Sequence, residues 1–193
     1  MNVGTKSVLF GVHQFLIHPV IVARAWWIVH EEWPELHEWA AIITHDLGYW
    51  GSPNMDGDHG EQHPERIAAW WRKYFGDFGY KVAVEVLGHS RFHAAKNNLP
   101  LSRLFQPDKL ASALYPRWLY LILGNLSGEI HEYMKHAQDG KYLDIVKSNK
   151  TQTQWLIETQ SHMALMGLHG EGYAPVKKQM DKDRAEAETH YEN

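Results

Sequence analysis

The residues best suited to chemistry in this sequence are a histidine and an aspartate that stand side by side, His45-Asp46. They close an apolar run that begins near Ala40, and Gly48 follows, where the chain can turn sharply. An imidazole and a carboxylate in this position can reach one cation, and the second carboxylate oxygen can bridge to another. Taken alone, such a doublet is far more often an ordinary surface pair at the C-terminus of a helix. It predicts a metal site only if other ligands converge on it.

Four further motifs supply such ligands, in chain order. His18 begins His-Pro-Val-Ile-Val-Ala, His63 begins His-Pro-Glu-Arg-Ile-Ala, His89 follows Leu-Gly, and Asp108 precedes Lys-Leu. Together with the doublet, these motifs resemble those of the HD superfamily of metal-dependent phosphohydrolases, in its variant with six ligands. The resemblance covers residues 13–115. Any one of these residues alone would be read as a core histidine or as an aspartate in the first turn of a helix.

The resemblance implies two metal positions. The first would be held by His18, His45, Asp46 and Asp108, and the second by His63 and His89 with Asp46 as the bridge. Histidine and carboxylate ligands suit one or two divalent ions such as Fe, Mn, Zn, Co or Ni, and the oxygen side could take Mg. Such an ion lowers the pKa of bound water and polarises a phosphoryl oxygen.

Two ligand positions have competitors four residues away, because residues at that spacing share a helix face. His59 competes with His63, and His93 competes with His89. The motif spacings favour His63 and His89. The catalytic residues are then predicted to be Asp46, which holds the metals, with His59 and His93 as acid, base or phosphate donor. The remaining histidines, including His13, are interpreted as surface or core residues.

Substrate contacts are sought near these ligands. Arg91, Lys96 and Lys109 could hold phosphate oxygens, although solvated surface charge is the competing interpretation. Tyr49 and Trp50 could stack on a base or wall the pocket, or simply pack under the loop. Tyr49 also occupies the place where related phosphohydrolases carry a glutamate, and the chain lacks the Gly-Tyr-Pro signature of cyclic dinucleotide hydrolases. Both departures leave the substrate open.

The elements that must position these residues are helices, because apolar residues recur at steps of three and four and no segment alternates like a strand. We expect an all-α, compact HD-type bundle of about six or seven helices. It would form a single domain over residues 1–176, with a charged, flexible tail over residues 177–193. The predicted helices include one near 80–95, one that begins at Pro107, and a last one near 143–168. In the second of these, the inward residues are expected to be Leu110, Leu114, Trp118 and Leu121.

Composition narrows the partners. The net charge of −4 gives no strong nucleic-acid signal, and the expected partner is a small phosphorylated substrate or nucleotide. There is no cysteine, which excludes disulfides and thiolate metal sites and fits a cytoplasmic location. The apolar stretch near residues 14–29 carries His18 and Arg24, so neither a signal peptide nor a membrane span is expected. A tryptophan-rich face could form a homodimer.

Three functions follow. The leading hypothesis is hydrolysis of a phosphomonoester, nucleotide or phosphodiester by metal-activated water. The second is a di-iron oxygenase that cleaves a small polar substrate with O₂, since some HD-domain relatives use the same ligand order in this way. The third is a non-catalytic metal or nucleotide sensor. The ligand set alone does not choose among them.

Overall fold

The computed structural model describes residues 1–57, 59–138 and 151–170. This part of the chain is all-α and contains no strand, which confirms the predicted fold class. Its elements are α1 (Val3–Phe10), α2 (Ile17–His30), α3 (Leu36–Thr44), the 3-10 helix η1 (His45–Tyr49), α4 (His63–Tyr74), α5 (Gly76–His89), α6 (Arg91–Lys96), α7 (Phe105–Leu114), α8 (Arg117–Ser127), α9 (Glu129–Gln138) and α10 (Gln152–His169). The ten described α-helices exceed the six or seven expected.

Two of the extra helices arise from breaks that periodicity did not reveal. The helix expected over 80–95 stops at His89, because Ser90 adopts an extended conformation and caps α6 by accepting a hydrogen bond from His93 N. The helix expected from Pro107 to Leu121 is interrupted at Tyr115, whose extended backbone is typical of a residue before proline. The inward orientation predicted for Trp118 is wrong, since its side chain is 65% exposed.

The other extra helices, α1 and α9, were not expected at all. The first is a short helix that buries small residues such as Gly4 and Ser7, so it carries no apolar stripe. The second starts directly after Gly128, whose positive φ of 88° ends α8 in the left-handed region that favours glycine. The last predicted helix ends as expected, at His169, while its predicted start at 143 and the tail over 177–193 lie outside the described residues.

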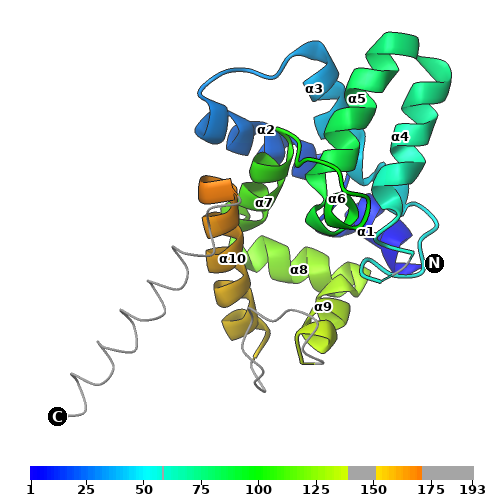
Figure 1. The fold of residues 1–193 in the computed structure, drawn as a ribbon. Coiled ribbons are helices and arrows are strands. Elements are labelled where there is room, and N and C mark those ends of the chain that lie inside the picture. Colours follow the sequence, from blue (N-terminus) through cyan, green and yellow to red (C-terminus); the bar gives the residue numbers. More distant parts are fainter. Residues whose placement is uncertain (58, 139–150, 171–193) are drawn as a thin grey trace.

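Long-range packing places the ligand-bearing helices against one another. In Figure 1, α4 and α5 run side by side at one end, α8 and α9 lie at the other, and α2 and α7 lie between them. Helix α7 contacts α2 on one side and α10 on the other. Two buried clusters support this arrangement, one around Trp26, Ile42 and Val86, and the other around Tyr120, Ile130 and Leu156. The metal-ligand candidates come from the middle helices α2 and α7, from η1, and from α4 and α5 at one end.

Two glycines allow the close approaches that the site requires. A Cβ on Gly48 would lie 2.0 Å from the carbonyl oxygen of His63, so only glycine lets η1 approach the start of α4. A Cβ on Gly167 would lie 2.6 Å from Cβ of Leu110, so α10 rests directly on α7. The first contact joins the His-Asp doublet to His63. The second brings α10 next to the helix that carries Asp108.

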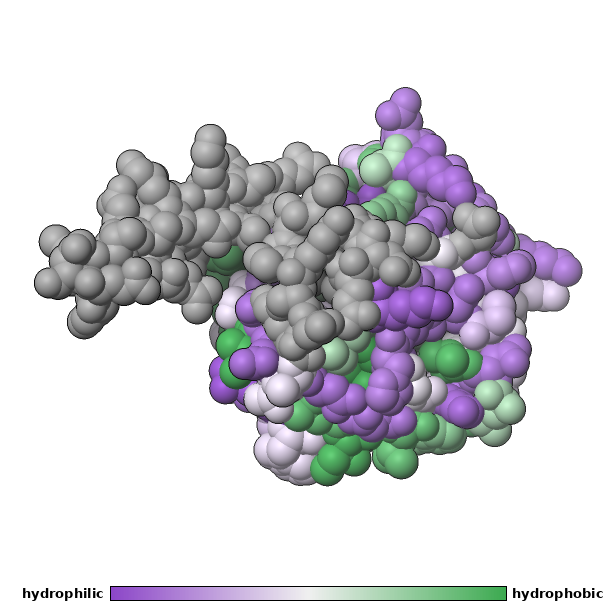
Figure 2. Space-filling model, turned by 90° about the horizontal axis from the view of Figure 1, so that it is seen from below, coloured by the Kyte–Doolittle hydropathy of each residue, from purple (hydrophilic) through white to green (hydrophobic). Residues whose placement is uncertain are grey.

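The surface carries apolar side chains in scattered places. Trp33, Trp50 and Trp118 are each more than half exposed, and they belong to three different parts of the chain. On the face seen in Figure 2, hydrophobic residues form several groups separated by hydrophilic ones. The predicted dimer therefore stays a prediction.

Among the described helices, none has both the length and the apolar character needed to cross a membrane.

Candidate metal centre

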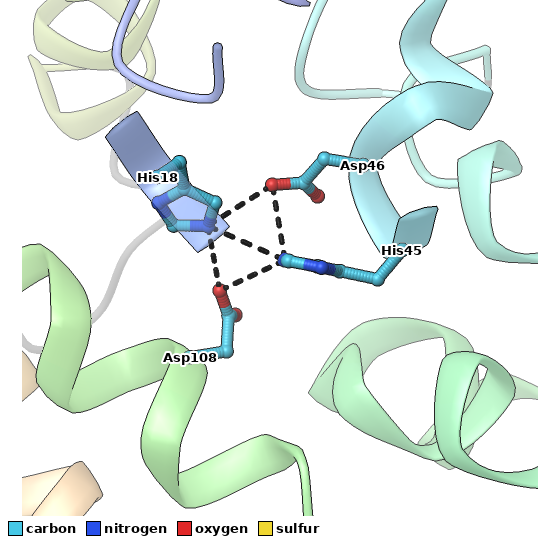
Figure 3. A group of neighbouring side chains, drawn as sticks. All are labelled: His18, His45, Asp46 and Asp108. Atoms are coloured by element: carbon cyan, nitrogen blue, oxygen red, sulfur yellow. Dashed lines mark hydrogen bonds and ion pairs between the residues drawn. The ribbon is translucent and has the colours of Figure 1, made fainter. Parts of the chain in front are cut away.

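Four side chains from three elements meet at one buried point. His18 comes from α2, the doublet His45-Asp46 from η1 and Asp108 from α7, and Figure 3 shows them pointing toward one another. The Nε2 atoms of His18 and His45 lie 3.2 and 3.1 Å from Asp46 Oδ2, and 3.3 and 3.4 Å from Asp108 Oδ1. Each of the four residues is at most 7% exposed.

These separations match those of atoms that share a cation. Two donors about 2.1 Å from one ion lie about 3.0 Å apart at a right angle and about 3.4 Å apart at the tetrahedral angle. All five distances among the four side chains, including 3.3 Å between the Nε2 atoms of His18 and His45, fall close to that interval. The group is therefore arranged as a coordination shell would be.

A second group forms around the other oxygen of Asp46. Its Oδ1 atom lies 3.6 Å from His63 Nε2 and 3.9 Å from His89 Nε2, and those two nitrogens are 3.1 Å apart. His63 begins α4 and His89 ends α5, and both are buried. Asp46 thus offers one oxygen to each group, which is the arrangement that a bridging carboxylate requires.

Backbone carbonyls fix how three of these rings are protonated. Nδ1 of His45, His63 and His89 each lies against the carbonyl oxygen three residues earlier, of Ile42, Gly60 and Val86. Because a carbonyl oxygen only accepts, each Nδ1 must carry the proton and donate it. In the neutral rings, Nε2 then presents a lone pair to the centre, which is the form that binds metal.

Electrostatics differ between the two groups. Burial and the neighbouring His89 hold the pKa of His63 well below its usual value, and burial together with His45 lowers the pKa of His89 to about 4. The Nε2 lone pairs of these two neutral rings therefore face each other at 3.1 Å. Without a cation, that contact is unfavourable. A divalent ion between the nitrogens would remove the repulsion.

In the first group, negative charge dominates. Burial lowers the pKa of His45, but the negative charges of Asp46 and Asp108 outweigh it and raise the pKa to about 10. Burial alone would raise the pKa of Asp46, yet the charges of His45 and His13 hold it well below its usual value. Two ionised aspartates in a buried place call for positive charge, which protons or a metal ion can supply.

Asp46 Oδ2 is buried beside the Nε2 atoms of His18 and His45, but it accepts no hydrogen bond of good geometry from them or from any other donor. A buried carboxylate oxygen without a donor is costly, whereas the same oxygen facing a cation is stabilised. Lys109 Nζ lies 2.8 Å from Asp108 Oδ2 and so holds Asp108 with its Oδ1 toward the histidines. The orphaned oxygen and the imidazole–carboxylate donor set therefore fit divalent metal. The identity of the metal is not fixed by this set.

A cavity of about 380 Å³ opens onto the centre. Asp46, His63, His89 and Asp108 lie in its wall, and so do three of the predicted substrate contacts, Arg91, Lys109 and Tyr49. The Tyr49 ring stacks on His63, with centroids 3.8 Å apart and planes within 17°. Two cations beside the metal ligands make this end of the cavity suited to an anionic group.

Several predicted residues do not reach the cavity. His59, Lys96 and Trp50 are exposed, and none of them lines it. His93 is buried but also stands outside the lining, where its Nε2 lies 3.4 Å from Glu65 Oε2. The structure therefore brings His63 and His89, rather than their competitors, to Asp46. The catalytic roles of His59 and His93 stay predictions that the cavity lining does not support.

A histidine that the sequence had left aside does line the cavity. His13 Nδ1 lies 2.9 Å from Oε2 of Glu129, and its ring centroid is 5.5 Å from that of His18. Glu129 is fully buried and also accepts hydrogen bonds from Ser7 Oγ, Val12 N and Ser127 Oγ. His13 precedes α2, so no helical spacing relates it to His18. Glu129 is the first residue of α9, and the sequence pattern of apolar and polar residues along that helix does not indicate that its side chain is buried.

The chain matches no protein-family model, no curated protein and no solved structure. The resemblance to the HD superfamily therefore rests on the motifs alone. The function must be argued from the geometry of the centre itself.

Proposed function

We propose that the protein is a metal-dependent phosphohydrolase that cleaves a small phosphate ester. One observation carries the proposal: six side chains converge in two groups that share Asp46, beside a cavity with Arg91 and Lys109 in its wall. Two ions bridged by a carboxylate, next to cationic side chains, form a site suited to a phosphoryl group. This centre also accounts for the orphaned oxygen of Asp46.

The metal would be held by His18, His45, Asp46 and Asp108 at the first position, and by Asp46, His63 and His89 at the second. When bound, such ions supply an activated water and polarise a phosphoryl oxygen. Arg91 binds phosphate oxygens at the mouth of the centre, where its planar guanidinium can form two parallel hydrogen bonds. Lys109 keeps Asp108 oriented and adds a second positive charge.

His13 is the group best placed to move a proton. Its Nδ1 donates to Glu129, and the shared buried carboxylate holds the ring at the cavity wall. The opposite nitrogen, Nε2, is then the atom available to exchange a proton with the substrate or leaving group. This role replaces the one predicted for His59 and His93, which lie outside the cavity lining.

The test combines metal analysis with phosphate release. The protein purified with Mn or Co should contain up to two ions per chain and release phosphate from a panel of small esters. Asp46→Asn keeps the shape of the side chain but removes its charge, so it should lose metal and activity together. Asp77→Asn, an exposed aspartate in α5, is the matched control. Full activity of Asp46→Asn without metal would end the proposal.

A di-iron oxygenase is the second candidate, and the dominance of imidazole favours it, because four of the six ligands are histidines. The two functions separate cleanly in one experiment. The protein is loaded with iron without oxygen and is then mixed with substrate in buffer that contains oxygen. If it is a hydrolase, it should show no substrate-dependent oxygen uptake. Oxygen uptake without phosphate release would transfer the assignment to the oxygenase, and ligand binding without either would indicate a sensor.

A further inference from the structure

The cavity continues beyond the metal centre to a wall formed by α8, α9 and α10. Tyr120, Tyr133 and Trp155 line this end, as do Thr159 and Met163. The rings of Tyr133 and Trp155 are nearly parallel, at 14°, with centroids 6.4 Å apart, so each presents a flat apolar face. The flexible methionine can adapt to a bound group. This end is aromatic, whereas the metal end is charged.

Two polar atoms of this wall have no hydrogen-bond partner in the described part of the chain. They are Trp155 Nε1 and Thr159 Oγ1, and their residues are 4% and 6% exposed. The two residues stand four apart on α10, so they share one face of the helix. A buried N–H or hydroxyl without a partner destabilises a protein, and such atoms call for an explanation. Because both residues line a cavity, a bound ligand is the natural partner.

We propose that Trp155 and Thr159 form a recognition subsite for the organic part of the substrate. This inference rests on the proposed function and adds the substrate class. The ligand is a compact phosphate ester whose organic group is a planar ring with hydrogen-bond acceptors. Its phosphate faces Arg91 and the metal ligands, and its ring lies against the aromatic wall. Indole N–H only donates, so the ring must offer a carbonyl oxygen or a ring nitrogen.

The size of the cavity limits the candidates. Ligand pockets span roughly 300–1,000 Å³, and this one is near the lower bound at about 380 Å³. It therefore suits one ring system with a single phosphate rather than a polymer or a dinucleotide.

The probes are adenosine 5′-monophosphate, phenyl phosphate and ribose 5-phosphate, with adenosine as the ligand without phosphate. The first carries both a planar ring and acceptors, the second a ring without acceptors, and the third acceptors without a planar ring. Binding to metal-loaded protein is measured by calorimetry. We expect adenosine 5′-monophosphate to bind most tightly of the three esters, and adenosine to bind without any turnover.

Two variants remove the polar atoms while keeping much of each side chain. Trp155→Phe and Thr159→Val should each weaken binding of adenosine 5′-monophosphate about three- to tenfold, the change expected for one hydrogen bond. Binding of phenyl phosphate should stay the same. Trp118→Phe and Thr153→Val are the matched controls, because both residues are exposed.

The thermal stability of the variants distinguishes a role of Thr159 in ligand recognition from a role in holding the fold. Thr159→Val removes an unpartnered buried hydroxyl, so the melting temperature of the ligand-free protein should stay the same or rise. Equal binding of the three esters, or unchanged affinity for adenosine 5′-monophosphate in both variants, would overturn the subsite. A lowered melting temperature of Thr159→Val would do the same. Adenosine binding is independent of hydrolysis, so these outcomes are separable from failure of the proposed activity.

Discussion

The Nε2 atoms of His63 and His89 lie 3.1 Å apart, and each ring is held in place by a hydrogen bond from Nδ1 to a backbone carbonyl one turn earlier. Two lone pairs in such a contact repel unless a positive charge lies between them. The backbone has thus fixed both rings in the protonation state that a cation needs.

Metal should therefore stabilise the fold. At a free Mn or Zn concentration of 100 times Kd, binding to the native state adds about 2.7 kcal/mol. For a chain of this length, that free energy corresponds to a rise in Tm of about 5–10 °C. Thermal denaturation with and without a chelator measures the shift.

The second metal position should be removable without the first. His89→Ala takes away one of its three ligands and leaves His18, His45 and Asp108 intact, so the metal content should fall from two ions per chain to one. His131→Ala, an exposed histidine in α9 that belongs to no cluster of possible metal ligands, is the control. Elemental analysis of the purified variants gives the answer, and two ions retained in His89→Ala would contradict the assignment.

Metal affinity should rise with pH. Burial alone lowers the pKa of His45, but the neighbouring carboxylates raise it to about 10, so the metal-free ring keeps its proton at neutral pH. An incoming ion must displace that proton, and binding becomes tighter as the pH rises toward that pKa. Calorimetry in buffers of different ionisation enthalpy should show proton release at pH 7. Release of no proton would disagree with this account.

The His13–Glu129 pair should stabilise the metal-free protein below neutral pH. Burial lowers the pKa of His13, but Asp46 and Glu129 outweigh it and raise the pKa to about 9. A raised folded pKa gives stability that is complete below the unfolded value of about 6.5 and is lost as pH rises toward 9. His13→Gln should flatten the dependence of unfolding free energy on pH between these values. Urea denaturation of the metal-free variant and parent across this range tests the claim.

The two members of this pair should differ in what they affect. His13→Gln should lower kcat about 10²- to 10⁴-fold, as expected for a lost proton-transfer group, with the fold retained. Glu129→Gln should destabilise the protein by about 3 kcal/mol, because its four hydrogen-bond donors lose a charged acceptor. His93→Gln serves as the comparison and should leave kcat unchanged. Equal losses of kcat in His13→Gln and His93→Gln would refute the role of His13.

Gly48→Ala should damage both the fold and the centre. Its Cβ would lie 2.0 Å from a backbone oxygen of His63, and neither segment can yield without moving a ligand. We expect a loss of more than about 3 kcal/mol and of the second metal. Gly124→Ala, whose Cβ would lie 3.3 Å from Cβ of Ile130 and so makes a much looser contact, should cost less. Urea denaturation and metal analysis compare the two variants.

The sequence allowed the helical class and the ligand motifs to be predicted because both follow local patterns. The convergence of His18, Asp46 and Asp108 was expected because their motifs resemble those of the HD superfamily, since periodicity alone does not relate residues on different helices. The breaks at Ser90 and Pro116 were missed because apolar periodicity continues across them.

His13 and Glu129 were missed for a different reason. They are 116 positions apart in the sequence, and their pairing arises only when α9 packs near the start of the chain. The position of His59 and His93 outside the cavity lining has a related cause. The spacing of four assumes one continuous helix, but His59 precedes α4 and His93 belongs to α6, so neither shares a helix with its competing ligand.

Asp46 turns one oxygen toward each group of ligands, so ions held by the two groups would be thermodynamically linked. A rotation of this carboxylate that improves contact with one ion changes the field and the geometry at the other. By reciprocity, whatever the first ion does to the affinity for the second, the second does to the first. The centre should consequently load with cooperativity, positive or negative, rather than as two independent sites.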